Sequence, residues 1–287
     1  MPFERILVPT DGSTCAEAAV SYAADLASRY GAAVDVLCVV DARTLDNVPH
    51  RERETEASGA VAREIAAELT DQGLTVTDAV RTGVPHEEIL GYADEEDIDL
   101  IAMGTHGRTG VERYILGSVT EKVVRLSSIP VLTVHATQES TPTFPYTDIL
   151  LPTDGSDVAT DAVDVGLDIA VTYGARVHAL SVVETVVLGA DATGDVFDTI
   201  EEVARDAVEA VADRAERAGV DAIETAVEFG HPYRAIRQYT DEHDIDLVVM
   251  GTHGRSGIER YLLGSVTEKT LRTSTVPVLT VRPPAEE

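Results

Sequence analysis

Residues 6–13 read Ile-Leu-Val-Pro-Thr-Asp-Gly-Ser, a short apolar run that ends in a proline and a polar turn. The apolar run is typical of a buried strand, and the turn residues after it predict a tight connection to the next element. Residues 149–156 read Ile-Leu-Leu-Pro-Thr-Asp-Gly-Ser, so the same strand and turn occur a second time. This strand and turn indicate that the chain contains an internal repeat.

A second motif repeats together with the first. Met-Gly-Thr-His-Gly-Arg occupies residues 103–108 and returns at residues 250–255. The repeat spans about half the chain, whereas the units of solenoid and propeller proteins are roughly 20–50 residues long. The sequence therefore predicts two duplicated domains, residues 1–138 and 148–287, with a Thr-, Ser- and Pro-containing linker at residues 139–147.

Strand and helix signals alternate within each half. Five short apolar, β-branched segments of the first half are expected to be strands, namely Arg5–Val8, Val34–Val40, Val76–Arg81, Leu100–Met103 and Val131–Val134. The helical segments between them are an apolar stripe from Cys15 to Tyr30, then Arg51–Thr70, Pro85–Glu95 and Ser118–Leu126. The spacing of Thr14 and Glu17 is that of a capping box and predicts where the first helix begins.

This alternation predicts an α/β fold in each half, as a doubly wound, parallel five-stranded sheet with helices on both faces. Parallel strands need crossover connections, and these place helices on the faces of the sheet. In such folds ligands bind beyond the carboxyl ends of the strands, where the strand order reverses. The turns after the first and fourth strands are therefore where a binding site is expected.

The chain of 287 residues carries 51 Asp and Glu against 22 Lys and Arg, a formal net charge of -29. Such a field repels nucleic acids and anionic lipids, so neither a nucleic acid nor a membrane surface is an expected partner. The acid is spread along the chain, which favours adaptation to a salty cytoplasm over an acidic docking surface. The N-terminus does not resemble a signal peptide, and the two cysteines offer no disulfide framework, so a cytoplasmic location is expected.

The turn after the fourth strand has the composition of an anion-binding loop. Gly104 and Gly107 are followed after nine residues by Gly117 and Ser118, which open a helix. Glycines let the backbone approach a polyphosphate and adopt positive φ, and the N–H groups of a helix N-terminus favour an anion. Ser118 is either the N-cap of that helix or a donor to a phosphate oxygen. The intact second copy favours binding over a plain connector.

The turn after the first strand supplies an acid to the same crevice. Asp11 can accept a hydrogen bond from an adenine amine or a ribose hydroxyl, or it can cap the first helix. The chain has neither a G-x-x-x-x-G-K-[ST] loop nor a G-x-G-x-x-G fingerprint after its first strand. The two commoner nucleotide-binding folds are therefore not indicated.

The Pro-Thr-Asp-Gly-Ser turn and the spacing G-x2-G-x9-G-[ST] resemble the universal stress protein (UspA) family, in its ATP-binding subset. The resemblance covers essentially the whole chain, once per half. It implies a strand order of 3-2-1-4-5 in each sheet and ATP, with or without Mg, bound between strands one and four. It also implies that the halves pair through their last strands, Val131–Val134 and Val278–Val281, and it is compatible with a homodimer of tandem chains.

The resemblance also assigns site residues in each half. Asp11 and Asp154 are expected to contact the adenosine, and Val40 and Val183 to line the adenine pocket. The Met-Gly pair after each fourth strand is expected to border the ribose and base, and the later glycines and serines to hold the phosphates. The full set of expected nucleotide-binding residues is Pro9, Thr10, Asp11, Val40, Met103, Gly104, His106, Gly107, Arg108, Gly117, Ser118, Val119, Thr120, Pro152, Thr153, Asp154, Val183, Met250, Gly251, His253, Gly254, Arg255, Gly264, Ser265, Val266 and Thr267.

Several polar residues of the loop have alternative interpretations. His106 and His253 are expected to contact phosphate or backbone rather than to act in catalysis, because no His, Cys or carboxylate cluster surrounds either one in sequence. Arg108 and Arg255 either offset the charge of ATP or lie in a solvated loop. The two cysteines fall on an apolar helix stripe and a core strand and are expected to be buried, inert thiols. No metal-binding or catalytic residue is expected.

The leading hypothesis is a cytosolic, ATP-binding stress-response regulatory protein with one nucleotide site per half, acting through nucleotide occupancy and assembly. Phosphoryl transfer needs a positioned base or nucleophile and a metal-holding carboxylate, which the loop does not supply. A slow ATPase or a self-phosphorylating enzyme remains an alternative. An ATP-pyrophosphatase would need a Ser-Gly-Gly-x-Asp-Ser-like loop after its first strand, and a nucleotide-independent dimerisation adaptor would not need two intact glycine motifs.

Because the acidic residues are dispersed over both halves, we predict that folding depends on salt. Lowering the salt lengthens electrostatic screening from ~3 Å at 1 M to ~10 Å at 0.1 M, so repulsion between neighbouring carboxylates grows. The denaturation midpoint is expected to fall as KCl is removed. An unchanged midpoint between molar and millimolar KCl would contradict this prediction.

Overall fold

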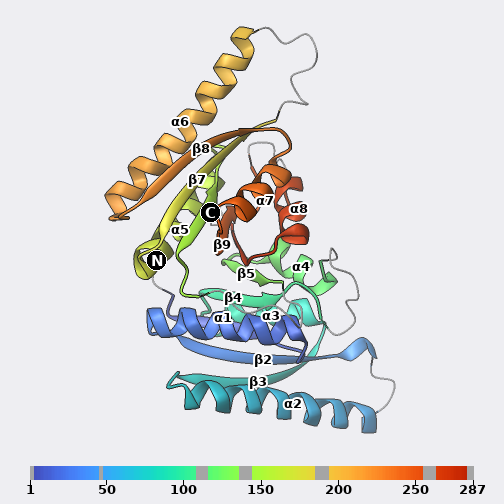
Figure 1. The fold of residues 1–287 in the computed structure, drawn as a ribbon. Helices are drawn as coiled ribbons and strands as arrows, with labels where there is room; N and C mark the ends of the chain where they lie inside the picture. Colours follow the sequence, from blue (N-terminus) through green and yellow to red (C-terminus); the bar gives the residue numbers. More distant parts are fainter. Residues whose placement is uncertain are drawn as a thin grey trace. The chain divides into compact units, whose positions relative to one another are not determined.

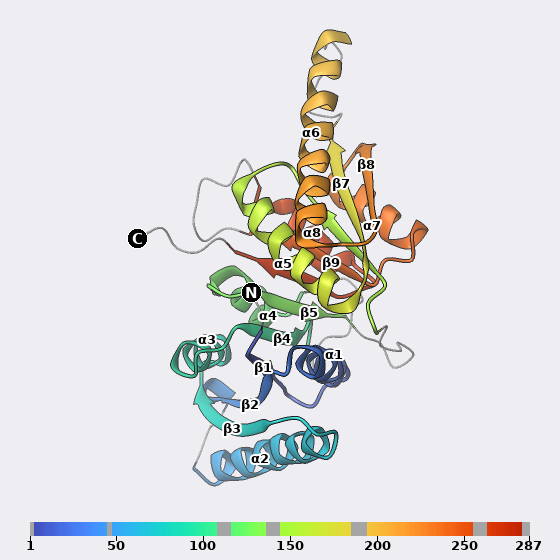
Figure 2. The same cartoon turned by 90° about the vertical axis from the view of Figure 1, so that its left-hand side faces the viewer.

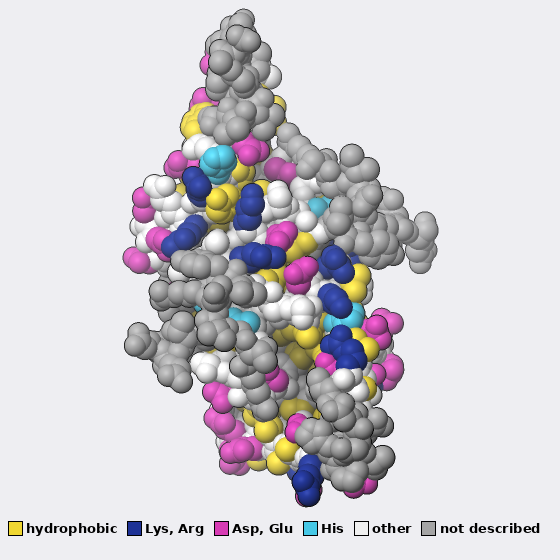
Figure 3. All heavy atoms as spheres, turned by 90° about the vertical axis from the view of Figure 1, so that its right-hand side faces the viewer, with side chains coloured by type: hydrophobic (Ala, Val, Ile, Leu, Met, Phe, Trp, Pro, Cys, Tyr) yellow, Lys and Arg dark blue, Asp and Glu magenta, His cyan; other side chains and the backbone are white. Residues whose placement is uncertain are grey.

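The computed structural model describes residues 3–44, 48–107, 116–135, 144–184, 194–254 and 263–282. The chain forms two compact units, Pro2–Pro142 and Thr143–Glu287 (Figure 1). No helix in the described part of the chain has the length and apolar content that crossing a bilayer requires. On the face that Figure 3 shows, acidic side chains lie at many separate places rather than in one block.

In the first unit the strands pair in parallel in the order β3-β2-β1-β4-β5. These strands are β1 (Arg5–Pro9), β2 (Ala33–Asp41), β3 (Val76–Gly83), β4 (Leu100–Gly104) and β5 (Val131–Val134). The helices are α1 (Thr14–Tyr30), the 3-10 turn η1 (Ala42–Thr44), α2 (Val48–Asp71), α3 (Pro85–Glu95) and α4 (Ser118–Leu126). Helices α1 and α3 lie on opposite sides of β1 and β4 (Figure 2), and α4 packs against α3.

The second unit repeats this arrangement, with parallel strands in the order β8-β7-β6-β9-β10. Its strands are β6 (Asp148–Pro152), β7 (Arg176–Val183), β8 (Ile223–Phe229), β9 (Leu247–Gly251) and β10 (Val278–Val281). Its helices are α5 (Asp157–Tyr173), α6 (Gly194–Ala218), α7 (Pro232–Glu242) and α8 (Ser265–Thr273). The predicted fold class, a tandem pair of doubly wound parallel α/β sheets, is confirmed.

The central strands are buried on both faces, since helices cover each side of the sheet. Ile6, Leu7 and Val8 of β1 are all inaccessible to solvent, as are Ile149, Leu150 and Leu151 of β6. A strand covered on both faces has an apolar run without alternation, and the sequence shows this pattern. The core of each unit is therefore centred on the strand whose end carries the Pro-Thr-Asp-Gly-Ser turn.

The predicted capping box at the start of α1 is wrong by one residue. Ser13 is the N-cap, with an extended backbone, and its side chain accepts a hydrogen bond from the backbone N–H of Ala16. Thr14 is therefore the first helical residue, and Glu17 lies one position too late to close the box. Ser156 caps α5 in the same way through Ala159.

Candidate functional site

A cavity of about 410 Å³ lies at the carboxyl ends of β1 and β4 in the first unit. The strand order reverses here, because β1 pairs with β2 on one side and with β4 on the other. The lining residues come from the ends of β1 and β4 and the turns after them, from β2, and from the N-terminal parts of α1, α3 and α4. They are Pro9, Thr10, Asp11, Ser13, Ala16, Leu37, Val39, Asp41, Pro85, Ile89, Met103, Gly104, His106, Gly107, Gly117, Ser118, Val119 and Thr120.

The lining includes every first-half residue expected to bind nucleotide except Val40 and Arg108. Arg108 and its counterpart Arg255 lie outside the described residues. Val40 is buried but does not line the cavity, which Val39 and Asp41 line instead. Successive side chains of a strand point to opposite faces, so Val40 faces away from a cavity that its two neighbours line.

Sequence reasoning also missed an apolar wall of the cavity, formed by Leu37 and Val39 of β2 and by Ile89 of α3. Two signals could have identified these residues. Leu37, Val39 and Asp41 follow the period of two along a strand, and Pro85 marks the start of the helix that carries Ile89.

The turn after β1 is held by hydrogen bonds to its own side chains. The N–H of Gly12 donates to Thr10 Oγ1 at 3.1 Å, and the N–H of Ser13 donates to Asp11 Oδ1 at 3.0 Å. Gly12 has a φ of 72°, a left-handed conformation that glycine adopts without strain. The alternative in which Asp11 caps α1 is wrong, because Ser13 caps it. The second carboxylate oxygen of Asp11 lies so close to Gly107 that a Cβ on that glycine would collide with it.

The glycines of the loop after β4 are needed for close packing rather than for positive φ. None of Gly104, Gly107 and Gly117 has positive φ, so that expectation is wrong for them. A Cβ on Gly104 would lie 2.7 Å from Cys15 Cβ and 2.8 Å from the Cys15 carbonyl carbon. Gly117 donates its N–H to the Thr105 carbonyl at 2.7 Å, and a Cβ there would crowd the same oxygen.

Helix α4 opens onto the cavity without a side-chain cap. Its N-cap is Gly117, which makes no capping hydrogen bond, and Ser118 is the first helical residue. The interpretation of Ser118 as the N-cap is therefore wrong. The first N–H groups of a helix have no intrahelical acceptor, and here Ser118, Val119 and Thr120 all line the cavity. This helix start can bind an anion.

Electrostatics at the opposite end of the cavity are set by Asp41. Arg43 Nη2 donates to Asp41 Oδ2 at 2.6 Å, and the hydrogen bonds from Arg43 lower the pKa of Asp41. The carboxylate therefore stays ionised and accepts hydrogen bonds at neutral pH. Beside the lining residue Pro85, burial and the charge of Lys122 lower the pKa of His86, which keeps that imidazole neutral.

The second unit repeats the local hydrogen bonding of this site. Gly155 N–H donates to Thr153 Oγ1 at 3.1 Å, and Ser156 N–H donates to Asp154 Oδ1 at 3.0 Å. A Cβ on Gly254 would collide with the second carboxylate oxygen of Asp154, as at the first site. Most of the remaining expected residues occupy the corresponding strand ends and helix start, namely Pro152, Val183, Met250, Gly251, Gly264, Ser265, Val266 and Thr267, and His253 lies in the loop after β9.

The profile of the Universal stress protein family matches residues 2–135 and 145–282. The chain belongs to the universal stress protein family. The Universal stress protein Mb2028c of Mycobacterium bovis is 30% identical over 293 residues, which cover 96% of both chains. The Universal stress protein MJ0577 of Methanocaldococcus jannaschii is 35% identical over 153 residues, which cover 46% of this chain and 94% of the relative. A universal stress protein of Archaeoglobus fulgidus shares the fold, with a TM-score of 0.74 and 24% identity over 97% of this chain and 98% of its own.

The two halves of this universal stress protein differ beside the loop histidine. In the first half Cys15 Sγ lies 3.5 Å from His106 Nε2, and Thr105 Oγ1 lies between the Nδ1 atoms of His106 and His135 at 3.2 and 3.1 Å. The thiol is buried, as expected, but it contacts the loop imidazole directly. The internal repeat aligns Cys15 with Val158, so the sequence alone could have identified this contrast.

In the second half, valine and arginine replace the cysteine and the second histidine, at Val158 and Arg282. Burial, and then the charge of Arg282, lower the pKa of His253. A lowered pKa keeps this imidazole neutral at pH 7, so it offers a ligand one donor and one acceptor instead of a charge.

The hydroxyls of Thr120 and Thr267 link the first turns of α4 and α8 to the ends of β4 and β9 by hydrogen bonds. Thr267 Oγ1 donates to the Gly251 carbonyl at 2.8 Å in a buried contact, and Thr120 does the same to Gly104. We predict that Thr267→Val destabilises the second unit by roughly 1–3 kcal/mol, because the carbonyl loses its buried donor. Urea unfolding followed by circular dichroism measures the change.

Thr273→Val on the same helix is the matched control, since its hydroxyl donates to the Lys269 carbonyl at an exposed position. It is expected to change the free energy of unfolding by less than about 0.5 kcal/mol. Equal effects of the two substitutions would show that the Gly251 carbonyl does not depend on Thr267.

Proposed function

We propose that this universal stress protein binds one adenine nucleotide in each half and acts as a stress-response regulator whose assembly follows nucleotide occupancy. The observation that carries the proposal is that the uncapped start of α4 and the Asp11 turn line one cavity at the strand-order reversal. An anion-binding end and an acceptor-bearing end in one cavity suit a ligand with a polar ring and an anionic tail.

The chemistry of the lining supports an adenosine at one end and phosphates at the other. Leu37, Val39 and Ile89 provide an apolar surface for a flat ring, and the carboxylates of Asp11 and Asp41 can accept from an amine or a hydroxyl. Ser118 supplies an exposed hydroxyl beside the N–H groups of α4. The cavity volume falls within the ~300–1,000 Å³ that small-molecule sites commonly have.

The charge of the lining favours ATP that carries a cation. The described lining residues include two carboxylates and neither lysine nor arginine. These carboxylates would repel free ATP, and so would the protein as a whole, which has a formal net charge of -29. Bound Mg²⁺ neutralises part of the phosphate charge, so we propose that Mg-ATP is the form that binds.

Binding rather than turnover is the function that these residues favour. Helix N–H groups and a serine hydroxyl stabilise a bound phosphate but do not activate a water molecule. The imidazole of His106 is already engaged by Cys15 and Thr105. The proposed role of the nucleotide is therefore to set the state of the protein while it stays bound.

We predict that calorimetric titration with Mg-ATP in molar KCl gives two nucleotides per chain, because both halves carry the turn and the loop. Gly107→Ala and Gly254→Ala offer a matched pair, since each new methyl group pushes one aspartate, Asp11 or Asp154, out of its place. Each variant is expected to bind one nucleotide and the double variant none. A wild-type stoichiometry near one, or variants that bind as the wild type does, would contradict two such sites.

We also predict that Ser118→Ala combined with Ser265→Ala weakens ATP binding but not adenosine binding. Each hydroxyl is expected to donate one charge-assisted hydrogen bond to a phosphate, worth roughly 1.5–3 kcal/mol. ATP affinity should then fall by about one to two powers of ten.

Adenosine is the control ligand, because it does not reach the helix start. A melting curve of the double variant tests the structural alternative. Equal weakening of both ligands, or a loss of stability with ATP binding intact, would mean that the phosphate end is assigned wrongly.

A further inference from the structure

The two units carry an acid and a base, Asp35 and His178, at the same buried position of their second strands. Asp35 pairs in register with Leu7, and Arg5 Nε donates to its Oδ2 at 2.6 Å. In the second unit His178 pairs in register with Leu150 at the corresponding place, and its Nε2 lies 3.1 Å from Asp148 Oδ1. Acid and base have therefore exchanged strands between the two units.

The neighbours of this position have changed together with it. Asp35 pairs in register with Thr77 on β3, whereas His178 pairs with Glu224 on β8. The C-cap of α3 is Glu96, and the C-cap of α7 is His243. The second unit thus collects two imidazoles and a carboxylate where the first unit has an aspartate, a threonine and a glutamate.

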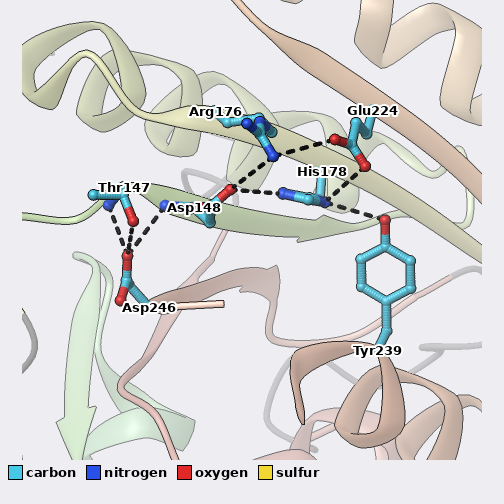
Figure 4. Close-up of polar contacts among 7 residues, drawn as sticks. All are labelled: Thr147, Asp148, Arg176, His178, Glu224, Tyr239 and Asp246. Atoms are coloured by element: carbon cyan, nitrogen blue, oxygen red, sulfur yellow. Dashed lines mark hydrogen bonds and ion pairs between the residues drawn. The ribbon is translucent and has the colours of Figure 1, made fainter. Parts of the chain in front are cut away.

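The hydrogen bonds of His178 define which nitrogen can act as a ligand (Figure 4). An ionised carboxylate only accepts, so Nε2 carries the proton that is donated to Asp148. Nδ1 then carries no proton, and its lone pair accepts from the hydroxyl of Tyr239 at 3.1 Å. A metal bound at Nδ1 would replace this hydrogen bond. Glu224 Oε2 lies 3.8 Å from the same Nδ1. Metal-ligating histidines usually donate their other N–H to a carboxylate in this way.

We propose that His178, Glu224 and His243 form a binding site for a late first-row divalent cation such as Zn²⁺, oriented by the carboxylate of Asp148. The ligand atoms of the three residues all lie within 4.8 Å of one another. Tetrahedral Zn²⁺ with bonds of about 2.0–2.1 Å places its ligands roughly 3.3–3.5 Å apart, so the side chains have to close by about an ångström. Glu224 and His243 are exposed and can make this movement, whereas the buried His178 is held in place.

The ligand set selects the class of metal. Two imidazoles and one carboxylate suit Zn²⁺ and its neighbours, whereas Mg²⁺ and Ca²⁺ prefer oxygen donors alone. A fourth position is left for water, because the two outer ligands are exposed.

One nearby charge opposes the cation. Arg176 Nη1 lies 3.3 Å from Glu224 Oε1 and 3.6 Å from Asp148 Oδ1 (Figure 4). Arg176 is half exposed, and it contacts the oxygen of Glu224 that does not face His178. Its removal should therefore strengthen metal binding, which gives a test in the opposite direction.

The site lies apart from the proposed nucleotide site of the same unit. Asp148 and Arg176 are the first residues of β6 and β7, and Glu224 is the second residue of β8. The cluster therefore belongs to the amino ends of the strands, whereas the nucleotide is proposed to bind at the carboxyl ends. Failure of one proposal leaves the other intact.

The experiment is a calorimetric titration of the full chain, expressed without a polyhistidine tag and stripped of metal, with Zn²⁺ in molar KCl and excess Mg²⁺. The excess Mg²⁺ occupies carboxylate-only sites on the acidic surface. The wild type is expected to show one tight site per chain, and its melting temperature should rise with Zn²⁺. Co²⁺ in place of Zn²⁺ should give the visible absorption of a tetrahedral site.

Glu224→Gln and His243→Gln are each expected to weaken Zn²⁺ binding at least tenfold, and Asp148→Asn by about 10–100-fold. Arg176→Gln should strengthen it. Glu96→Gln, the matched exchange at the C-cap of α3, should leave it unchanged. Melting of each variant without metal verifies that it folds. If a variant does not fold, His243→Ala is used in its place, because the His243 side chain is exposed.

The proposal is overturned if the wild type has no tight Zn²⁺ site. It is also overturned if Glu224→Gln and His243→Gln bind as the wild type does. In either case His178 is a hydrogen-bonded core histidine.

Discussion

The close approach of α1 to the end of β4 is the constraint on which the rest of each unit depends. A side chain on Gly104 would meet the backbone and Cβ of Cys15, and one on Gly251 would meet Val158. Because this position has no side chain, the turn after β1 and the loop after β4 come within contact distance. The carboxylate of Asp11 then reaches Gly107, and a second small residue is needed there. One packing contact thus brings together two turns that are far apart in the sequence.

Gene duplication has preserved this contact while its surroundings have diverged. The backbone bonds and threonine hydroxyls that hold the loops are the same in both units. The side chains behind the loop histidine differ between the units. Val158 is the equivalent of Cys15, and Arg282 is the equivalent of His135. Hydrogen bonds to backbone depend little on neighbouring side chains, so they persist, whereas the polarity behind each imidazole is free to change. The two loops therefore share their hydrogen bonds to backbone but differ in the polarity of their surroundings.

The equivalent buried positions Asp35 and His178 hold ionisable groups that the two units stabilise in different ways. A buried ionisable group has to be paired, because an isolated charge in the core is costly. The first unit pairs a buried acid with an arginine, which is always charged. The second unit pairs a buried imidazole with Asp148 through one nitrogen, and the other, unprotonated nitrogen accepts from a tyrosine hydroxyl. Among the described residues, the exchange keeps the buried groups paired and brings two imidazoles and a carboxylate together in the second unit.

The sequence by itself determined the duplicated α/β fold, the bounds of α3 and α4, and the two turns that line the cavity. These features depend on short-range signals, such as Pro85 at a helix start and apolar runs bounded by glycine. Only the tertiary structure decided that Val39 and Asp41 line the cavity in place of Val40, and that Ser13 and Gly117 are the N-caps. It also decided that His178, Glu224 and His243 meet. Strand facing, cap geometry and the convergence of three elements depend on how distant segments pack, which no local pattern of residues encodes.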